Sequence, residues 1–98
     1  MYELRFTKSA ERYFKKLKEQ GLKAAYRKAL EEIAADPYIG GLKTGDLAGI
    51  YGFDVYYSRT NYEIAYRIYE EEGHIVAVIM AGTRENFYKE LKRYIDAL

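Results

Sequence analysis

The sequence contains no cysteine, which excludes a disulfide framework, a cysteine metal site and a cysteine nucleophile. It also lacks a long hydrophobic run, because its longest apolar segment, residues 75–81, is far too short to span a bilayer. The chain shows no secretory signal pattern, so we expect a cytoplasmic protein with no membrane partner. Neither a metal-ligand cluster nor a nucleotide-binding loop is present, and we expect no metal and no cofactor.

The residues that are present indicate a globular protein. Of the 98 residues, 49% are apolar and 32% are charged, which is typical of a packed domain rather than of a disordered chain. This length predicts a single domain over residues 1–98. The chain has 12 tyrosines. Tyrosine suits surfaces that are half packed and half wet, including surfaces that stack on bases or bind partners.

The charge is unevenly placed along the chain, although the net charge is only +1. Residues 1–30 hold nine Lys and Arg against three acids, whereas residues 31–72 hold three against nine. A basic helical half and an acidic central half give a polar electrostatic field despite the neutral total. Ordinary solvated helix faces explain the basic cluster equally well.

Hydrophobic periodicity and turn residues predict the order of the elements. Strand-like alternation covers residues 2–7, and two helices form an αα-hairpin that Gly21 divides and Asp36-Pro37 ends. A glycine-rich loop follows at 38–49; then come strands at about 50–58, 62–70 and 74–82 with turns at 60–61 and 72–73, and a helix at 84–97 capped by Thr83. The predicted fold is therefore α+β, in the order β-α-α-β-β-β-α. A small antiparallel sheet packs on the αα-hairpin, with a C-terminal helix and one sheet face partly open.

The open face carries the candidate polar residues. Alternation in the strand 62–70 places Glu63 and Arg67 on this face, while Tyr66 points to the core. If Thr60-Asn61 forms a tight turn, Asp54 lies opposite Arg67, and the two side chains form an ion pair across the hairpin. This pair either holds the sheet together or orients Arg67 towards a phosphate.

An ordered set of segments resembles the RelE/ParE superfamily of toxins from type II toxin–antitoxin systems. The segments are Tyr2–Phe6, the helical hairpin ending in Asp36-Pro37, Leu42-Lys43, Leu47–Tyr51, Tyr62–Ile68, Val78–Arg84 and Phe87-Tyr88. The resemblance covers essentially the whole chain, and it implies a RelE-like fold of the microbial-RNase type. In that superfamily, ribosome-dependent members cut mRNA by attack of a ribose 2′-OH on its own 3′-phosphate. Members of the ParE branch instead inhibit DNA gyrase.

The resemblance also implies a metal-independent mechanism for the RNA-cutting members. Their arginines bind the phosphate, and a Lys, Glu, His or Tyr moves protons. Positioned guanidinium groups stabilise the negative charge that gathers on a pentacoordinate phosphorane. The Gly-Thr-Arg sequence at 82–84, followed by Phe87-Tyr88, looks more like the RelE branch than the ParE branch.

Carried over by position, the resemblance implies a catalytic set. Arg84 matches the RelE arginine that follows the final strand, and Tyr88 lies close to the tyrosine of that branch. Glu63 is a candidate general base of the kind that YoeB-like toxins use. Arg67, on the same face but at no matching catalytic position, is the fourth catalytic candidate. Each also has a structural interpretation: Arg84 as a surface residue, Tyr88 in packing beside Leu91, Glu63 as an exposed carboxylate. Candidate RNA-binding residues are Lys43, Tyr56 and Arg59.

The sequence departs from the RelE pattern at three positions. Glu63 stands where RelE and YoeB types have an arginine, and Asp54 and Tyr56 stand where RelE has paired lysines. These departures remove positive charge from the expected catalytic face, and Arg67, Arg59 and Lys43 are the cations available to compensate.

The function expected from the resemblance is that of a toxin that cleaves mRNA on the ribosome and is held in check by a cognate antitoxin. Its partners are then the antitoxin, the ribosome and mRNA, with a monomeric free toxin and a higher oligomer in the complex. One alternative is a toxin-fold protein that does not cleave RNA, such as a ParE-like gyrase inhibitor or an inactive relative; the missing basic residues favour it. Another is a plain α+β module that binds RNA or protein.

Overall fold

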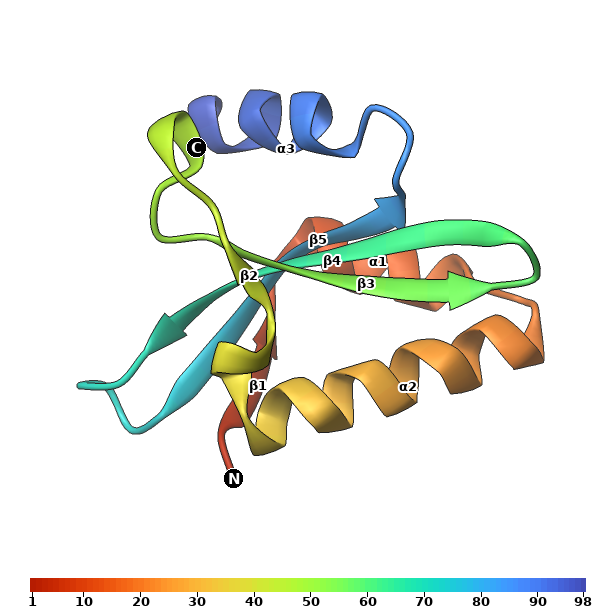
Figure 1. Ribbon diagram of the computed structural model, residues 1–98, viewed down its shortest axis with the longest axis horizontal. Helices are drawn as coiled ribbons and strands as arrows, with labels where there is room; N and C mark the ends of the chain where they lie inside the picture. The colour runs from red at the N-terminus through yellow and green to blue at the C-terminus, as the bar shows by residue number, and fades with distance from the viewer.

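The computed structural model describes residues 1–98 as three α-helices around a five-stranded sheet (Figure 1). The strands are β1 (Glu3–Phe6), β2 (Gly41–Leu42), β3 (Tyr51–Tyr57), β4 (Thr60–Tyr69) and β5 (Ile75–Thr83), and the helices are α1 (Lys8–Lys16), α2 (Gln20–Ala35) and α3 (Phe87–Asp96). Two short 3₁₀ turns, η1 (Pro37–Ile39) and η2 (Gly45–Leu47), lie in the loop between α2 and β3. The predicted α+β class is confirmed, and the elements follow the predicted order except that the segment 38–49, predicted to be a loop, contains the short strand β2. None of the helices is both long enough and apolar enough to cross a membrane.

The sheet is mixed. Its strand order is β1-β5-β4-β3-β2. The three long strands pair antiparallel as predicted, and so does the short β2, but β1 runs parallel to β5. The N-terminal strand therefore forms one edge of the sheet beside the strand that ends at the candidate site.

The helices α1 and α2 cover one face of the sheet. Their apolar side chains meet those of β3, β4 and β5 in a core that contains Tyr26, Ile33, Ile64 and Val78. Thr7 caps α1, because its Oγ1 accepts a hydrogen bond from the Ala10 N–H at 3.2 Å. Gly21 does not separate the two helices but lies in the first turn of α2, where the Tyr57 side chain occupies the space of a Cβ.

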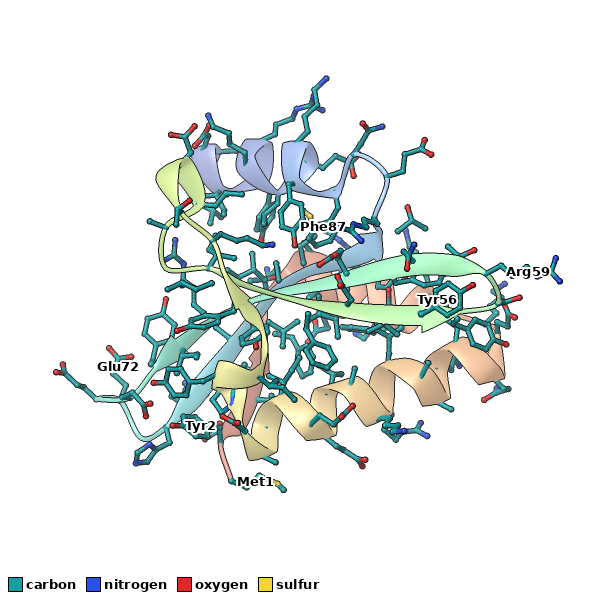
Figure 2. All side chains as sticks on the ribbon, viewed as in Figure 1. Met1, Tyr2, Tyr56, Arg59, Glu72 and Phe87 are labelled. Carbon is teal, nitrogen blue, oxygen red and sulfur yellow. The ribbon has the colours of Figure 1, made fainter.

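The helix α3 covers the opposite face, which the sequence predicted to be partly open. A second core beneath it comprises Ile50, Ala65, Ile79, Phe87 and Leu91, and Phe87 points from α3 to the sheet in Figure 2. An ion pair of 3.6 Å between Lys92 Nζ and Asp46 Oδ2 joins α3 to the loop that contains η2. The part of this face towards the β3–β4 hairpin remains uncovered, where Tyr56 is exposed, so the site lies at the margin of a packed layer.

The β3–β4 hairpin turns at Ser58 and Arg59, not at residues 60–61. Both turn residues have positive φ angles, 49° and 63°, as expected for a two-residue turn whose twist matches the strands. Thr60 pairs with Tyr57 and Asn61 with Tyr56, so both extend β4. The turn moves by an even number of residues, so every side chain keeps its face although its partner changes.

The observed register overturns the predicted ion pair between Asp54 and Arg67. The residue opposite Asp54 is Glu63. Arg67 lies beyond the end of this pairing and pairs instead with Ala77 of β5. Two carboxyl groups therefore face each other at the point where a carboxylate and a guanidinium were expected.

Candidate functional site

Glu63 is the centre of the site. It lies on the face of β4 that α3 covers, and its side chain is only 2% exposed. Its Oε2 accepts a hydrogen bond of 2.8 Å from the Tyr88 hydroxyl, and its Oε1 lies 3.7 Å from Arg84 Nε. A buried carboxylate requires such partners, because loss of water costs an ion far more than a neutral group. The structure therefore contradicts the interpretation of Glu63 as an exposed strand carboxylate.

The environment of Glu63 shifts its proton affinity. Burial raises the pKa of Glu63 to about 7, and the Asp54 carboxyl acts in the same direction, while Tyr88 and Arg84 act against it. Burial and the neighbouring Glu63 also raise the pKa of the Tyr88 phenol, so Tyr88 remains a proton donor. A carboxyl group that titrates near neutrality is suited to proton transfer in the cell.

Lys43 and Gly52 complete the surroundings of Tyr88. Lys43 Nζ lies 4.6 Å from the centre of the Tyr88 ring, a cation–π distance. The backbone N–H of Lys43 donates to the carbonyl of Ile50 at 2.8 Å, which fixes the lysine beside β3. Gly52 supplies the necessary space: a Cβ there would collide with the Tyr88 hydroxyl and would lie 3.0 Å from Lys43 Cε and 3.4 Å from Glu63 Oε2.

Arg84 precedes α3 instead of beginning it. The helix starts at Phe87, and Asn86, with φ 59°, occupies the N-cap position that was expected for Thr83. The Arg84 N–H donates to the Asn61 carbonyl at 2.9 Å, which anchors the residue to β4. Its side chain is 59% exposed. The guanidinium therefore has one side towards Glu63 and the other towards solution, where a phosphate can reach it.

The remaining predicted residues lie around this cluster. Tyr56, 66% exposed, stands on β3 opposite Asn61, and Arg59 extends from the tip of the hairpin (Figure 2). A polar hollow of about 450 Å³ joins this tip to the end of β5, lined by Arg59, Thr60, Asn61, Thr83, Arg84 and Glu85. Arg67 does not join the cluster: it lies by Gly49, where a Cβ would be 3.2 Å from its Nη1.

The arrangement provides the parts for acid–base chemistry on an anion. Glu63 and Tyr88 share a short hydrogen bond, and Arg84 and Lys43 place positive charge on two sides of them. No group of three or more His, Cys, Asp or Glu side chains could hold a metal ion. The cluster can thus bind a phosphate through its cations and move a proton through its carboxyl and phenol groups.

Comparisons with known proteins decide the family. A model of the ParE-like toxins of type II bacterial toxin–antitoxin systems matches residues 4–92. The chain belongs to this family. No curated protein sequence matches it significantly.

Solved structures of toxin–antitoxin complexes are similar to this toxin. The RelBE2 complex from Mycobacterium tuberculosis contains a chain that is 30% identical, with a TM-score of 0.64; the match covers 85% of this chain and 98% of that one. The intact Escherichia coli RelBE complex gives 26% identity and a TM-score of 0.70, over 84% of this chain and 95% of that one. A free mutant of E. coli RelE, at 24% identity, shares the fold with a TM-score of 0.74 over 99% and 98% of the chains. The predicted membership of the RelE/ParE superfamily is confirmed.

Two contributors to the site of this toxin were not recognised in the sequence. Gly52 interrupts a strand rich in aromatic residues, and a glycine inside a strand often marks the close approach of another group. The sequence therefore contained a signal that another group lies close to Gly52. Asp54 was assigned to Arg67 because of the misplaced turn, and its position opposite Glu63 follows only from the register.

Proposed function

We propose that this toxin is a ribosome-dependent mRNA endonuclease that inhibits translation in the cytoplasm. The observation that carries the proposal is the buried Glu63 carboxyl, which accepts a hydrogen bond from Tyr88 and has Arg84 and Lys43 close by. In ordinary strands a carboxyl is left in water, because burial without partners is costly. A buried, partnered carboxyl at the rim of an open surface indicates a group kept for chemistry.

The proposed reaction uses these groups without a cofactor. Glu63 takes the proton of the ribose 2′-OH as the bond from O2′ to phosphorus forms. Arg84 and Lys43 stabilise the charge that develops on the phosphorane oxygens. The bond from phosphorus to O5′ then breaks, Tyr88 donates its proton to O5′, and Glu63 returns a proton to Tyr88 through their 2.8 Å hydrogen bond. The products are a 2′,3′-cyclic phosphate and a 5′-hydroxyl.

The other predicted residues would hold the flanking RNA. Arg59 and Arg84 line the same polar hollow, which we assign to the backbone phosphate next to the reacting one. The exposed ring of Tyr56 is placed for stacking on a base. Arg67 lies away from Glu63, beside Gly49, and we assign it a phosphate contact at the rim.

We expect cleavage to require the ribosome. The net charge of +1 and the small basic surface cannot neutralise enough phosphates to grip free RNA. Purified toxin should leave naked mRNA intact and cut the same mRNA on programmed ribosomes, with cut sites located by mapping of RNA 5′ ends. The Glu63→Gln variant, in which the base is lost, is the control for a contaminating nuclease.

A non-cleaving toxin remains the second candidate. The acidic or neutral residues at Asp54, Tyr56 and Glu63, where the resemblance implies cations, favour it. If ribosomal mRNA stays intact and DNA supercoiling fails in cells that express the toxin, a ParE-like inhibition of gyrase is the function. If neither process changes, the chain is an inactive relative.

We also propose that a cognate antitoxin covers two surfaces. One is an apolar groove of about 790 Å³ between β1, α1 and α2, lined at its rim by Lys15, Lys23 and Arg27 and by the acids Glu11 and Glu31; the other is the exposed, charged side of α3. The RelBE structures are complexes of a related toxin with its antitoxin, and the basic rim suits an acidic partner segment. We expect the free toxin to be a monomer and the complex to be a higher oligomer.

Hydrogen exchange tests the antitoxin surfaces. With antitoxin bound, the amides of residues 84–97 and of β1 should exchange at least about tenfold more slowly, because a covering segment suppresses local opening. The strand β2 forms the edge of the sheet opposite to β1 and should exchange as in the free toxin. Unchanged exchange at 84–97 in a stable complex would place the antitoxin elsewhere.

A further inference from the structure

Asp54 has no place in the reaction as described, yet it stands directly across the sheet from the proposed base. It pairs with Glu63 in the antiparallel register of β3 and β4. Side chains of directly opposed residues share a face of the sheet, with Cβ atoms roughly 5 Å apart. The Asp54 carboxyl is one of the groups that raise the pKa of Glu63. A hydrogen bond between two carboxyl groups requires a proton on one of them, because an ionised carboxylate has only acceptors.

We propose that Asp54 and Glu63 form one acid–base unit that holds a single shared proton, with Asp54 as the residue that positions and tunes Glu63. Like charges directly opposed on a sheet repel each other, and Glu63 is 2% exposed, so water cannot screen the repulsion. Asp54 is exposed, so water solvates its carboxyl group. The shared proton is therefore held mainly by the buried partner.

Every charged or titratable group around the pair is consistent with this assignment. On the α3 side, Tyr88 donates to Glu63 but carries no charge. Arg84 is the only cation within ion-pair distance of Glu63, at 3.7 Å and largely in water. Lys43 lies against the Tyr88 ring, and Tyr26, across the sheet, is a neutral phenol with a raised pKa. One partly solvated guanidinium cannot neutralise two facing carboxylates, but a shared proton lowers the charge of the pair to −1, which one guanidinium can balance.

The proton affinity of the acid pair sets the pH range in which the proposed reaction can proceed, and this part of the inference depends on the proposed function. The pair becomes reactive when it loses its shared proton to solvent, and the ionised pair then takes the proton of the 2′-OH as the bond from O2′ to phosphorus forms. The proton is then shared between the two carboxyl groups and leaves through Tyr88 to O5′ as the bond from phosphorus to O5′ breaks. The pair ends the cycle ionised, as it began. Its high proton affinity makes Glu63 a stronger base than an isolated glutamate.

The decisive measurement is the titration of Glu63 itself, followed by the ¹³C shift of its side-chain carboxyl. In Asp54→Asn the opposing charge is gone and the amide donates a hydrogen bond to the ionised Glu63. The midpoint of Glu63 should therefore fall by about 1 pH unit or more. Glu72→Gln removes an acid from the distant β4–β5 turn and should leave the midpoint unchanged. An unchanged midpoint in Asp54→Asn would overturn the proposal.

The pH dependence of mRNA cleavage on ribosomes provides the second readout. The acidic limb of the rate profile for Asp54→Asn should shift to lower pH by the same amount as the Glu63 midpoint, and its plateau should be lower because the base is weaker. If the rate profile of Asp54→Asn has the wild-type plateau and an acidic limb at the wild-type pH, the proposed role of Asp54 is wrong. If the midpoint shifts but neither wild type nor variant cleaves mRNA, the acid pair stands and the nuclease proposal fails.

Discussion

Arg84→Ala should abolish growth arrest while leaving the protein folded. Arg84 is the cation next to the proposed base, 3.7 Å from Glu63 Oε1. Loss of a guanidinium that stabilises transition-state charge costs roughly 3 kcal/mol or more, about a hundredfold in rate. The side chain is 59% exposed, so we expect the thermal midpoint to change little. Cleavage on programmed ribosomes and growth after induction measure the loss.

Arg93→Ala is the matched control for this variant. Arg93 is an exposed arginine in the last turn of α3, away from Glu63, so its removal changes the net charge equally. This variant should remain toxic. If Arg84→Ala arrests growth like the wild type at equal expression, the reacting phosphate does not bind at the end of β5, and the proposed site is wrong.

The arrangement of the fold was largely predictable because its signals are local. Strand alternation in β3 and β4 and the Asp36-Pro37 stop after α2 each act within a few residues, and the structure places these elements as predicted. The faces of β4 were also correct: Ile64 and Tyr66 lie in the core with α1 and α2, and Ala65 lies on the other side. Family resemblance then gave the fold that the solved RelE structures share.

The geometry of the site was less predictable because it depends on pairing between distant segments. Neither Ser58 nor Arg59 is a glycine or an asparagine, yet both adopt the positive φ angles of the turn. The residue preferences of tight turns therefore favoured Thr60-Asn61 as the turn. That error changed the partner of Asp54 from Glu63 to Arg67. The burial of Glu63 beneath α3 likewise depends on tertiary packing. Alternation along a strand predicts which face of the sheet a side chain is on, but not whether that face is buried.

Gly52→Ala should eliminate activity through one added methyl group. Gly52 lies beneath the Tyr88 hydroxyl, and an alanine Cβ would collide with it and lie 3.0 Å from Lys43 Cε. Because Gly52 is a strand residue without a positive φ angle, alanine is compatible with its backbone. The tyrosine must therefore move away from Glu63, which removes the 2.8 Å hydrogen bond. A displacement of about 1 Å at a reacting group can cost roughly a hundredfold in rate.

Gly41→Ala provides an unusually close control, because Gly41 is the register partner of Gly52 on β2. A Cβ on Gly41 would have only the Gly52 carbonyl oxygen nearby, at 3.9 Å, an ordinary contact. This variant should cleave mRNA at the wild-type rate. Overpacking at Gly52 should also lower the free energy of unfolding, by about 1–3 kcal/mol, so chemical denaturation must show that Gly52→Ala is folded at the assay temperature. A folded Gly52→Ala protein with full activity would show that contact between Tyr88 and Glu63 is not needed for the reaction.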